Sequence, residues 1–180
     1  MKIYISYFYK VRFMKSNLLP VSTAKWDPDW FHHKPGTGMY DFKTGKQLKN
    51  YGLYLDKNNV LNGMRIENLV FPEEKFNELK SSNTIVCTPT CSYRDCIDSK
   101  NWCPFMIMYK EYLDGLNFDD MIFLLKTYVE NYKYQYNVKG NVDVVLLVHE
   151  PSACKCAERP VLKKWFKEHG VTLHEWQGGK

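Results

Sequence analysis

The sequence predicts an α/β fold: a single three-layer domain with a mostly parallel sheet and helices on both faces. The apolar run Val142–Val148 is typical of a central strand that is buried on both sides. A helical segment and a second apolar segment follow it, as in a strand–helix–strand unit. The length of 180 residues suits one domain with a substantial core and is short for two.

The first part of the chain contains several strand candidates, which include a short one at Thr84–Cys87, and one helix. Alternating apolar and aromatic residues indicate strands at Ile3–Tyr9 and Leu18–Ala24. A further strand is expected at Ile66–Phe71. Pro72 then opens a short helix at Glu73–Lys80, which has acidic residues in its first turn.

The elements of the second part follow from helix start and stop signals. Pro104–Leu113 begins with proline, a favoured first helical residue. Asn117 is the expected N-cap of a longer helix, about Phe118–Tyr134, whose apolar residues recur at intervals of three and four. After the central strand, we expect a helix at Pro160–His169 and a last strand at Val171–Trp176.

Two segments interrupt this pattern, but neither is expected to form a separate domain. Residues 34–75 carry scattered glycines among polar residues, which indicates an irregular insertion. Residues 87–103 form a Cys-rich loop. The whole chain, residues 1–180, is therefore expected to be one α/β domain.

Composition limits the compartment and the partners. The formal net charge of +5 and the 16% aromatic content permit a nucleotide or nucleic-acid partner without requiring one. No apolar stretch approaches 18 residues and the N-terminus resembles a strand, so we expect neither a membrane span nor a signal peptide. A cytoplasmic, reducing location follows, in which the six Cys are thiols or metal ligands.

The polar corner His149–Arg159, between the central strand and the next helix, is the main candidate site. Ligands of open α/β sheets bind beyond the carboxyl ends of strands, and a helix N-terminus attracts anions. Lys155 and Arg159 add positive charge, which would stabilise a thiolate at Cys156. Glu150 is a candidate base, or it orients His149.

A structural interpretation of the same corner stays open. A Cys at a helix start is often a small, partly buried residue, and Arg159 is also able to pair with Glu158 or Glu150. In addition, no base is identified for Cys156 by spacing alone.

The loop after the second strand supplies further ligand-binding candidates: Ser22, Lys25 and Trp26. If that strand is parallel to the central one, this loop reaches the same edge of the sheet. Trp26 would then stack on a base or sugar and Lys25 would contact a phosphate. Alternatively, the tryptophan packs as a lid on the core.

Four clustered cysteines are candidate metal ligands: Cys87, Cys91, Cys96 and Cys103. Clustered thiols in a reducing compartment suggest Zn²⁺, with an iron–sulfur cluster as the alternative. Their spacing matches neither a zinc ribbon nor a ferredoxin, and free thiols are the remaining interpretation.

Several segments together resemble the domain-of-unknown-function family numbered 488. They are Val21-Ser22-Thr23-Ala24 after the opening Ile-Tyr-x-Ser-Tyr-Phe strand, Cys103-Pro104-Phe105, and Val148-His149-Glu150-Pro151 with Cys156-Ala157-Glu158-Arg159. The resemblance implies an α/β fold and a site that contains Glu150, Cys156 and Arg159. The chain has Cys-Ala-Glu-Arg where the family has Cys-His-Arg, so the family's histidine has no direct equivalent.

Three hypotheses about function follow. The first is an enzyme that acts on a nucleotide or a nucleic-acid-linked substrate, with Glu150, Cys156 and Arg159 as catalytic residues. The second is a non-catalytic accessory protein, of phage or defence origin, that binds nucleic acid, a nucleotide or another anionic small molecule. The third is a structural protein stabilised by a metal. The Lys-, Tyr- and Asn-rich composition suits a phage or low-GC bacterial source.

Overall fold

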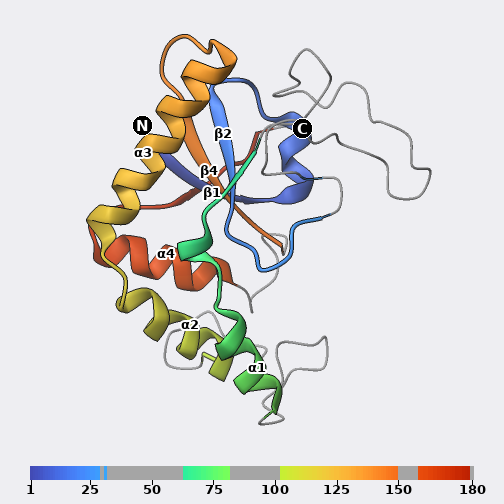
Figure 1. Cartoon of the computed structure of the whole chain (residues 1–180), viewed down its shortest axis with the longest axis vertical. Coiled ribbons are helices and arrows are strands. Elements are labelled where there is room, and N and C mark those ends of the chain that lie inside the picture. Colours follow the sequence, from blue (N-terminus) through green and yellow to red (C-terminus); the bar gives the residue numbers. More distant parts are fainter. Residues whose placement is uncertain (29–30, 32–62, 82–101, 150–157, 179–180) are drawn as a thin grey trace, which may run out of the picture.

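A five-stranded, all-parallel sheet forms the centre of the protein (Figure 1). The computed structural model describes residues 1–28, 31, 63–81, 102–149 and 158–178. The strand order is β3-β2-β4-β1-β5. The strands are β1 (Ile3–Tyr7), β2 (Leu18–Ser22), β3 (Met64–Arg65), β4 (Asp143–Val148) and β5 (His174–Glu175). The predicted α/β class and parallel sheet are confirmed.

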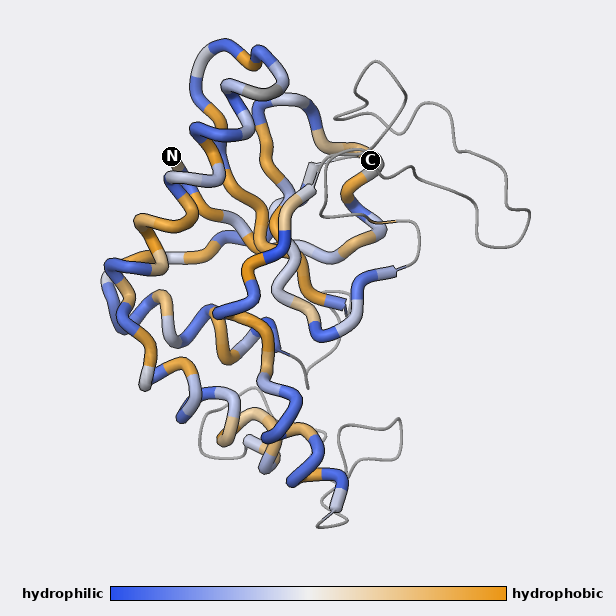
Figure 2. Tube along the Cα trace, in the orientation of Figure 1, coloured by the Kyte–Doolittle hydropathy of each residue, from blue (hydrophilic) through white to orange (hydrophobic). Residues whose placement is uncertain are grey.

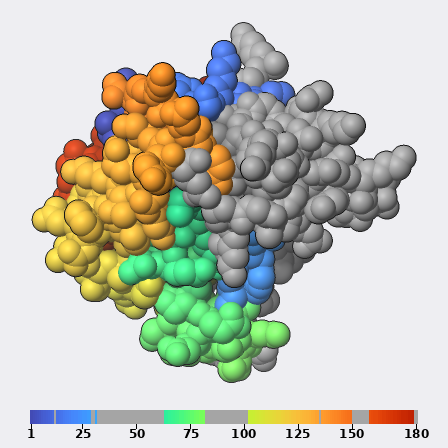
Figure 3. Space-filling view, turned by 45° about the horizontal axis from the view of Figure 1, so that its top comes forward, coloured from blue at the N-terminus to red at the C-terminus, as the bar shows by residue number. Residues whose placement is uncertain are grey.

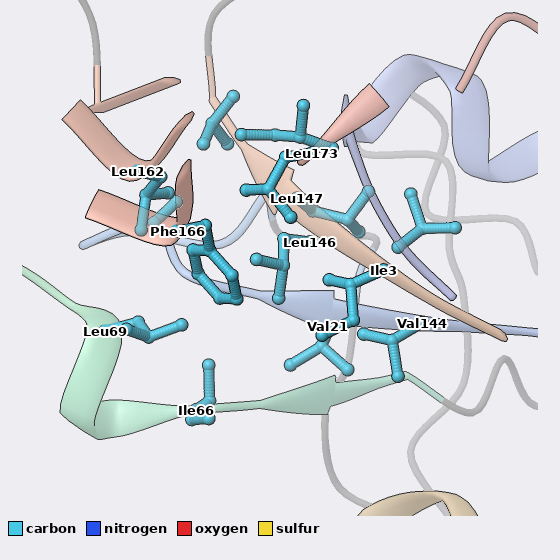
Figure 4. Close-up of a cluster of buried hydrophobic side chains, with 14 of the residues drawn as sticks. Ile3, Val21, Ile66, Leu69, Val144, Leu146, Leu147, Leu162, Phe166 and Leu173 are labelled. Atoms are coloured by element: carbon cyan, nitrogen blue, oxygen red, sulfur yellow. The ribbon is translucent and has the colours of Figure 1, made fainter. Parts of the chain in front are cut away.

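Strand β4 is the central strand, as its apolar sequence predicts. It pairs with β1 on one side and with β2 on the other. Every residue from Val144 to Val148 is buried, because both faces of the strand are covered. The cluster of side chains around Leu146 and Leu147 is shown in Figure 4.

Within the described residues, four α-helices and two 3-10 helices accompany the sheet. They are η1 (Phe8–Phe13), η2 (Glu67–Leu69), α1 (Glu73–Ser81), α2 (Pro104–Asp114), α3 (Phe118–Tyr136) and α4 (Glu158–Glu168). Pro104 begins α2, and Asn117 caps α3 by accepting hydrogen bonds from the backbone amides of Asp119 and Asp120. Gly170, with φ of +79°, ends the last helical segment.

The helices are divided between the two faces by the direction of the crossovers. The β3–β4 and β4–β5 connections cross the sheet in one direction and the β1–β2 connection crosses in the other. Because such crossovers are right-handed, α1 to α4 belong to one face and η1 to the opposite face. Figure 1 shows α3 and α4 on one side of the strands and η1 on the other.

The helical face is closed by side chains of α4 and by hydrogen bonds from tyrosines. Trp165 and Phe166 are fully buried. The hydroxyl of Tyr128 on α3 donates to the carbonyl of Arg65 at 3.3 Å. Figure 3 shows α3 beside the green segment of residues 63–81, and Figure 2 shows apolar residues concentrated in the strands.

Several predicted elements differ from those observed. The first strand ends at Tyr7, because the chain turns into η1 to cross to β2. The strand expected at Ile66–Phe71 is wrong: β3 ends at Arg65 and η2 follows. The last strand is only His174–Glu175, and it pairs with β1.

β3 and the start of α1 lie within residues 34–75, the range of the predicted insertion. Residues 34–62 of that range, the strand candidate Thr84–Cys87, and residues 87–101 of the Cys-rich loop are outside the described residues. None of the described helices has the length and apolar character needed to cross a bilayer.

Candidate functional site

The end of β4 is the point where neighbouring connections leave the sheet on opposite faces. β1 and β2 flank β4, and the connection that joins them carries η1 on one face. The chain after β4 leads to α4 on the other face. In doubly wound sheets, ligands bind outside the carboxyl ends of the strands at such a switch point. We call this place the β4 edge and define it by Phe8, Ser22, Lys25, Trp26 and His149.

The expected neighbourhood of the second and central strands is confirmed. β2 pairs with β4 in parallel, with Ser22 opposite Leu147. The amide and hydroxyl of Thr23 both donate to the Leu147 carbonyl, at 2.9 and 3.0 Å. The loop after β2 therefore begins at the same edge as His149.

Arg65 organises this loop, and we call Ser22, Lys25, Asp27 and Arg65 the Arg65 cluster. Arg65 donates to the Lys25 carbonyl at 3.0 Å and lies 3.5 Å from the Asp27 carboxylate. The Ser22 hydroxyl in turn donates to Asp27. Both the Asp27 and the Arg65 side chains are largely buried. The loop that carries Lys25 and Trp26 is thus held to the end of β3.

Sequence patterns did not identify Asp27 or Arg65. Ser22 is opposite Arg65 in the β2–β3 pair, and Ser6 of β1 is opposite Leu147. Paired residues of parallel strands point to the same face, so Ser6, Ser22 and Arg65 share one face of the sheet. An arginine at the end of a predicted strand is a weak signal, because its partners come from another strand.

Trp26 is 61% exposed and forms an edge-to-face contact with Phe76 of α1, with ring centroids 5.2 Å apart. The Lys25 ammonium lies 4.2 Å from the Phe76 ring centroid and 5.2 Å from that of Trp26. It also forms an ion pair with Glu73. Trp26 is therefore not a buried lid, and its ring is fixed by a cation–π contact and an aromatic contact.

His149, the residue after β4, is exposed, and its ring centroid lies 6.3 Å from that of Phe8 at the start of η1. This contact brings the ends of β1 and β4 together. The other sequence-predicted residues of the corner, Glu150, Lys155 and Cys156, lie outside the described residues.

Arg159 is described, and it is only 4% exposed. Its Nη1 lies 2.5 Å from Oε2 of Glu175, and Lys163 lies 2.8 Å from Oε1 of the same carboxylate. Arg159 therefore forms an ion pair with Glu175 of β5. Its charge is used to attach the first turn of α4 to the last strand.

Glu158, the first residue of α4, is also buried. Burial raises the pKa of Tyr109 on α2 well above its ordinary value, and the charges of Glu158 and of Tyr112 act in the same direction. The Tyr109 hydroxyl donates to the Leu69 carbonyl. A negative charge already accompanies the N-terminus of α4, where it is favourable to the helix dipole.

Of the predicted metal ligands, only Cys103 is described; it is buried at the N-cap position of α2. Cys87, Cys91 and Cys96 lie outside the described residues. Within the described ranges, no three His, Cys, Asp or Glu side chains are grouped so that they would hold a metal ion. The zinc and iron–sulfur hypotheses therefore stay predictions.

Comparisons with known proteins supply no relative: no family model, no curated protein and no solved structure matches the chain.

Proposed function

We propose that the protein is an enzyme that acts on a nucleotide or a nucleic-acid-linked substrate at the β4 edge. The observation that carries this proposal is the switch point at β4. It brings His149 and the Trp26 loop to one edge of the sheet, where doubly wound proteins bind their ligands.

The described residues suit the two ends of such a substrate. The exposed ring of Trp26 offers a stacking surface for a base, and its geometry is fixed by Lys25 and Phe76. The Lys25 ammonium is paired with Glu73, an exposed carboxylate, and a phosphate group would compete for the same cation.

Proton transfer is assigned to His149, because imidazole is the side chain best suited to acid–base chemistry near neutral pH. The sequence adds Glu150 as a second acid–base candidate and Cys156 as the candidate nucleophile, with Lys155 as a phosphate ligand. The resemblance to family 488 supports the choice of Glu150 and Cys156. Arg159 receives a positioning role, because it is buried against Glu175.

The test is calorimetric titration of the protein with a panel of nucleoside mono-, di- and triphosphates, followed by chromatography of the products. We expect Trp26→Ala to weaken binding about tenfold, and His149→Ala to lower turnover more than affinity. Glu150→Gln and Cys156→Ser should abolish turnover while binding is kept. Tyr134→Ala, on the exposed surface of α3, is the control.

The results separate catalysis from simple binding. Binding without any product would refute the enzymatic proposal and would favour the non-catalytic accessory protein. If none of the nucleotides binds, or if Trp26→Ala and Tyr134→Ala bind equally well, the assignment of the β4 edge is wrong.

A further inference from the structure

Three aromatic rings form a continuous, partly exposed row along the end of β1 and η1. The rings of Tyr7 and Tyr9 are stacked, with centroids 6.3 Å apart and an interplanar angle of 13°. Phe13 meets Tyr9 edge-to-face at 6.0 Å. Tyr9 is 50% exposed and Phe13 36%. We call Tyr7, Tyr9 and Phe13 the η1 aromatic row.

The net positive charge of the chain comes from the N-terminal segment that contains these rings. The residues before Asp27 contain five of the 25 Lys and Arg, and none of the 20 Asp and Glu. The rest of the chain holds 20 of each, so the N-terminal segment accounts for the whole formal net charge of +5. Lys10 belongs to η1, with its ammonium 5.8 Å from the Phe13 ring centroid, and the exposed Lys15 follows shortly after.

The exposed aromatic side chains of α3 lack this excess of basic residues. Phe123 and Tyr134 on α3 are 72% and 92% exposed. Their helix contains Asp119, Asp120 and Glu130 against only Lys126 and Lys133. The combination of exposed rings with an excess of basic over acidic residues in the surrounding sequence therefore distinguishes η1 from α3.

We propose that the η1 aromatic row binds single-stranded nucleic acid. Unpaired bases would stack on Tyr9 and Phe13, and the phosphates would be neutralised by Lys10 and Lys15. Proteins that bind single strands without sequence preference combine aromatic stacking surfaces with a basic track in this way. In a duplex the base faces are already stacked on one another, so a double strand would gain only the electrostatic part of the binding free energy.

The row leads directly to the β4 edge. Phe8, the first residue of η1, contacts His149. A strand bound along η1 would thus place one end beside the candidate acid–base residue. This inference deepens the proposed function and rests on it only for the identity of the reacting end. Strand binding itself does not require the reaction.

The test uses a fluorescein-labelled single-stranded oligo(dT) of twelve nucleotides, titrated with the full chain and followed by fluorescence anisotropy. Tyr9→Ala and Phe13→Ala should each weaken binding about tenfold or more, because each removes a stacking ring. Lys10→Gln should reduce the slope of log affinity against log salt by about 0.7, the value for one phosphate contact on a single strand. Circular dichroism and the thermal midpoint verify that each variant is folded.

Matched control variants come from α3: Phe123→Ala and Tyr134→Ala for the rings, and Lys126→Gln for the charge. These should bind oligo(dT) like the unmodified protein. The proposal is overturned if they weaken binding as much as the η1 variants do, or if the labelled duplex of the same length binds as tightly as the single strand.

Two further measurements separate this surface from its alternatives. Binding to vesicles with one-third phosphatidylserine, in the absence of oligo(dT) binding, would overturn the proposal in favour of a membrane surface. Phe13→Ala should retain mononucleotide binding at the β4 edge, whereas Trp26→Ala should lose it. Oligo(dT) binding without any mononucleotide binding would refute the proposed function and leave the η1 surface supported.

Discussion

Arg159 and Glu175 form a largely buried ion pair, with 2.5 Å between Nη1 and Oε2, that joins the first turn of α4 to the last strand of the sheet. The pair lies where the chain returns from the β4 edge. Lys163, one turn further along α4, binds the second carboxylate oxygen. The arginine predicted to bind an anionic ligand therefore holds an anion of its own chain.

Replacing Arg159 should destabilise the fold. Arg159→Met leaves the Glu175 carboxylate with only Lys163 and should lower the free energy of unfolding by about 3 kcal/mol, the low end for breaking a buried pair. Lys163→Met removes a more exposed cation from the same carboxylate and should cost less than about 1 kcal/mol. Urea denaturation measures both, and equal losses would contradict the structural role of Arg159.

The Tyr109 hydroxyl should contribute measurably to stability. It is fully buried and donates to the Leu69 carbonyl, so Tyr109→Phe leaves that acceptor without its donor and should cost about 1–2 kcal/mol. Tyr112→Phe removes a hydrogen bond to the Asn68 carbonyl at a more exposed position, and it should cost less. If the two variants show the same urea midpoint, burial of the Tyr109 hydroxyl is not the source of its contribution.

The free energy of unfolding should fall at alkaline pH. Burial raises the pKa of Tyr109 well above the ordinary value of 10.0, so the folded state keeps a proton that the unfolded chain loses. Its contribution is complete below about pH 10 and is lost as the pH rises towards the folded pKa.

Lys110 should also contribute to the fall in the free energy of unfolding at alkaline pH. Burial alone would lower the pKa of Lys110, but contacts with Asp114 and Glu168 raise it above the ordinary 10.5. Urea titrations at pH 8, 10 and 11 measure the decline. Tyr109→Phe should show a shallower decline than the unmodified protein, and identical slopes would exclude Tyr109 as a cause.

The Asn117 cap should stabilise α3. Its side-chain oxygen accepts from two backbone amides at 2.9 and 3.2 Å, and Asn117→Ala should cost about 1 kcal/mol. Asn131→Ala, at an exposed position within the same helix, is the matched control and should be neutral or slightly stabilising, because alanine is the better helix former. A loss of stability of equal size in both variants would show that the cap is unimportant.

Local signals were sufficient to predict most of the elements. The run Val142–Val148 predicted the central strand because its residues are apolar on both faces, and β4 is buried throughout. Pro104 and Asn117 predicted the starts of α2 and α3, because first-turn amides find no acceptor within the helix. Proline removes one of these donors, and the asparagine side chain supplies an acceptor. The position of the candidate site beyond β4 followed from the same strand and the general behaviour of parallel sheets.

Only the tertiary structure decided the order of the strands and the partners of the charged residues. β5 lies beside β1 instead of β4, and Arg159 pairs with Glu175, which no spacing in the sequence indicates. Likewise, Arg65 joins β3 to the loop after β2 across a long stretch of chain. Helices and buried strands depend on neighbouring residues, whereas strand order and ion pairs depend on which distant segments exclude water together.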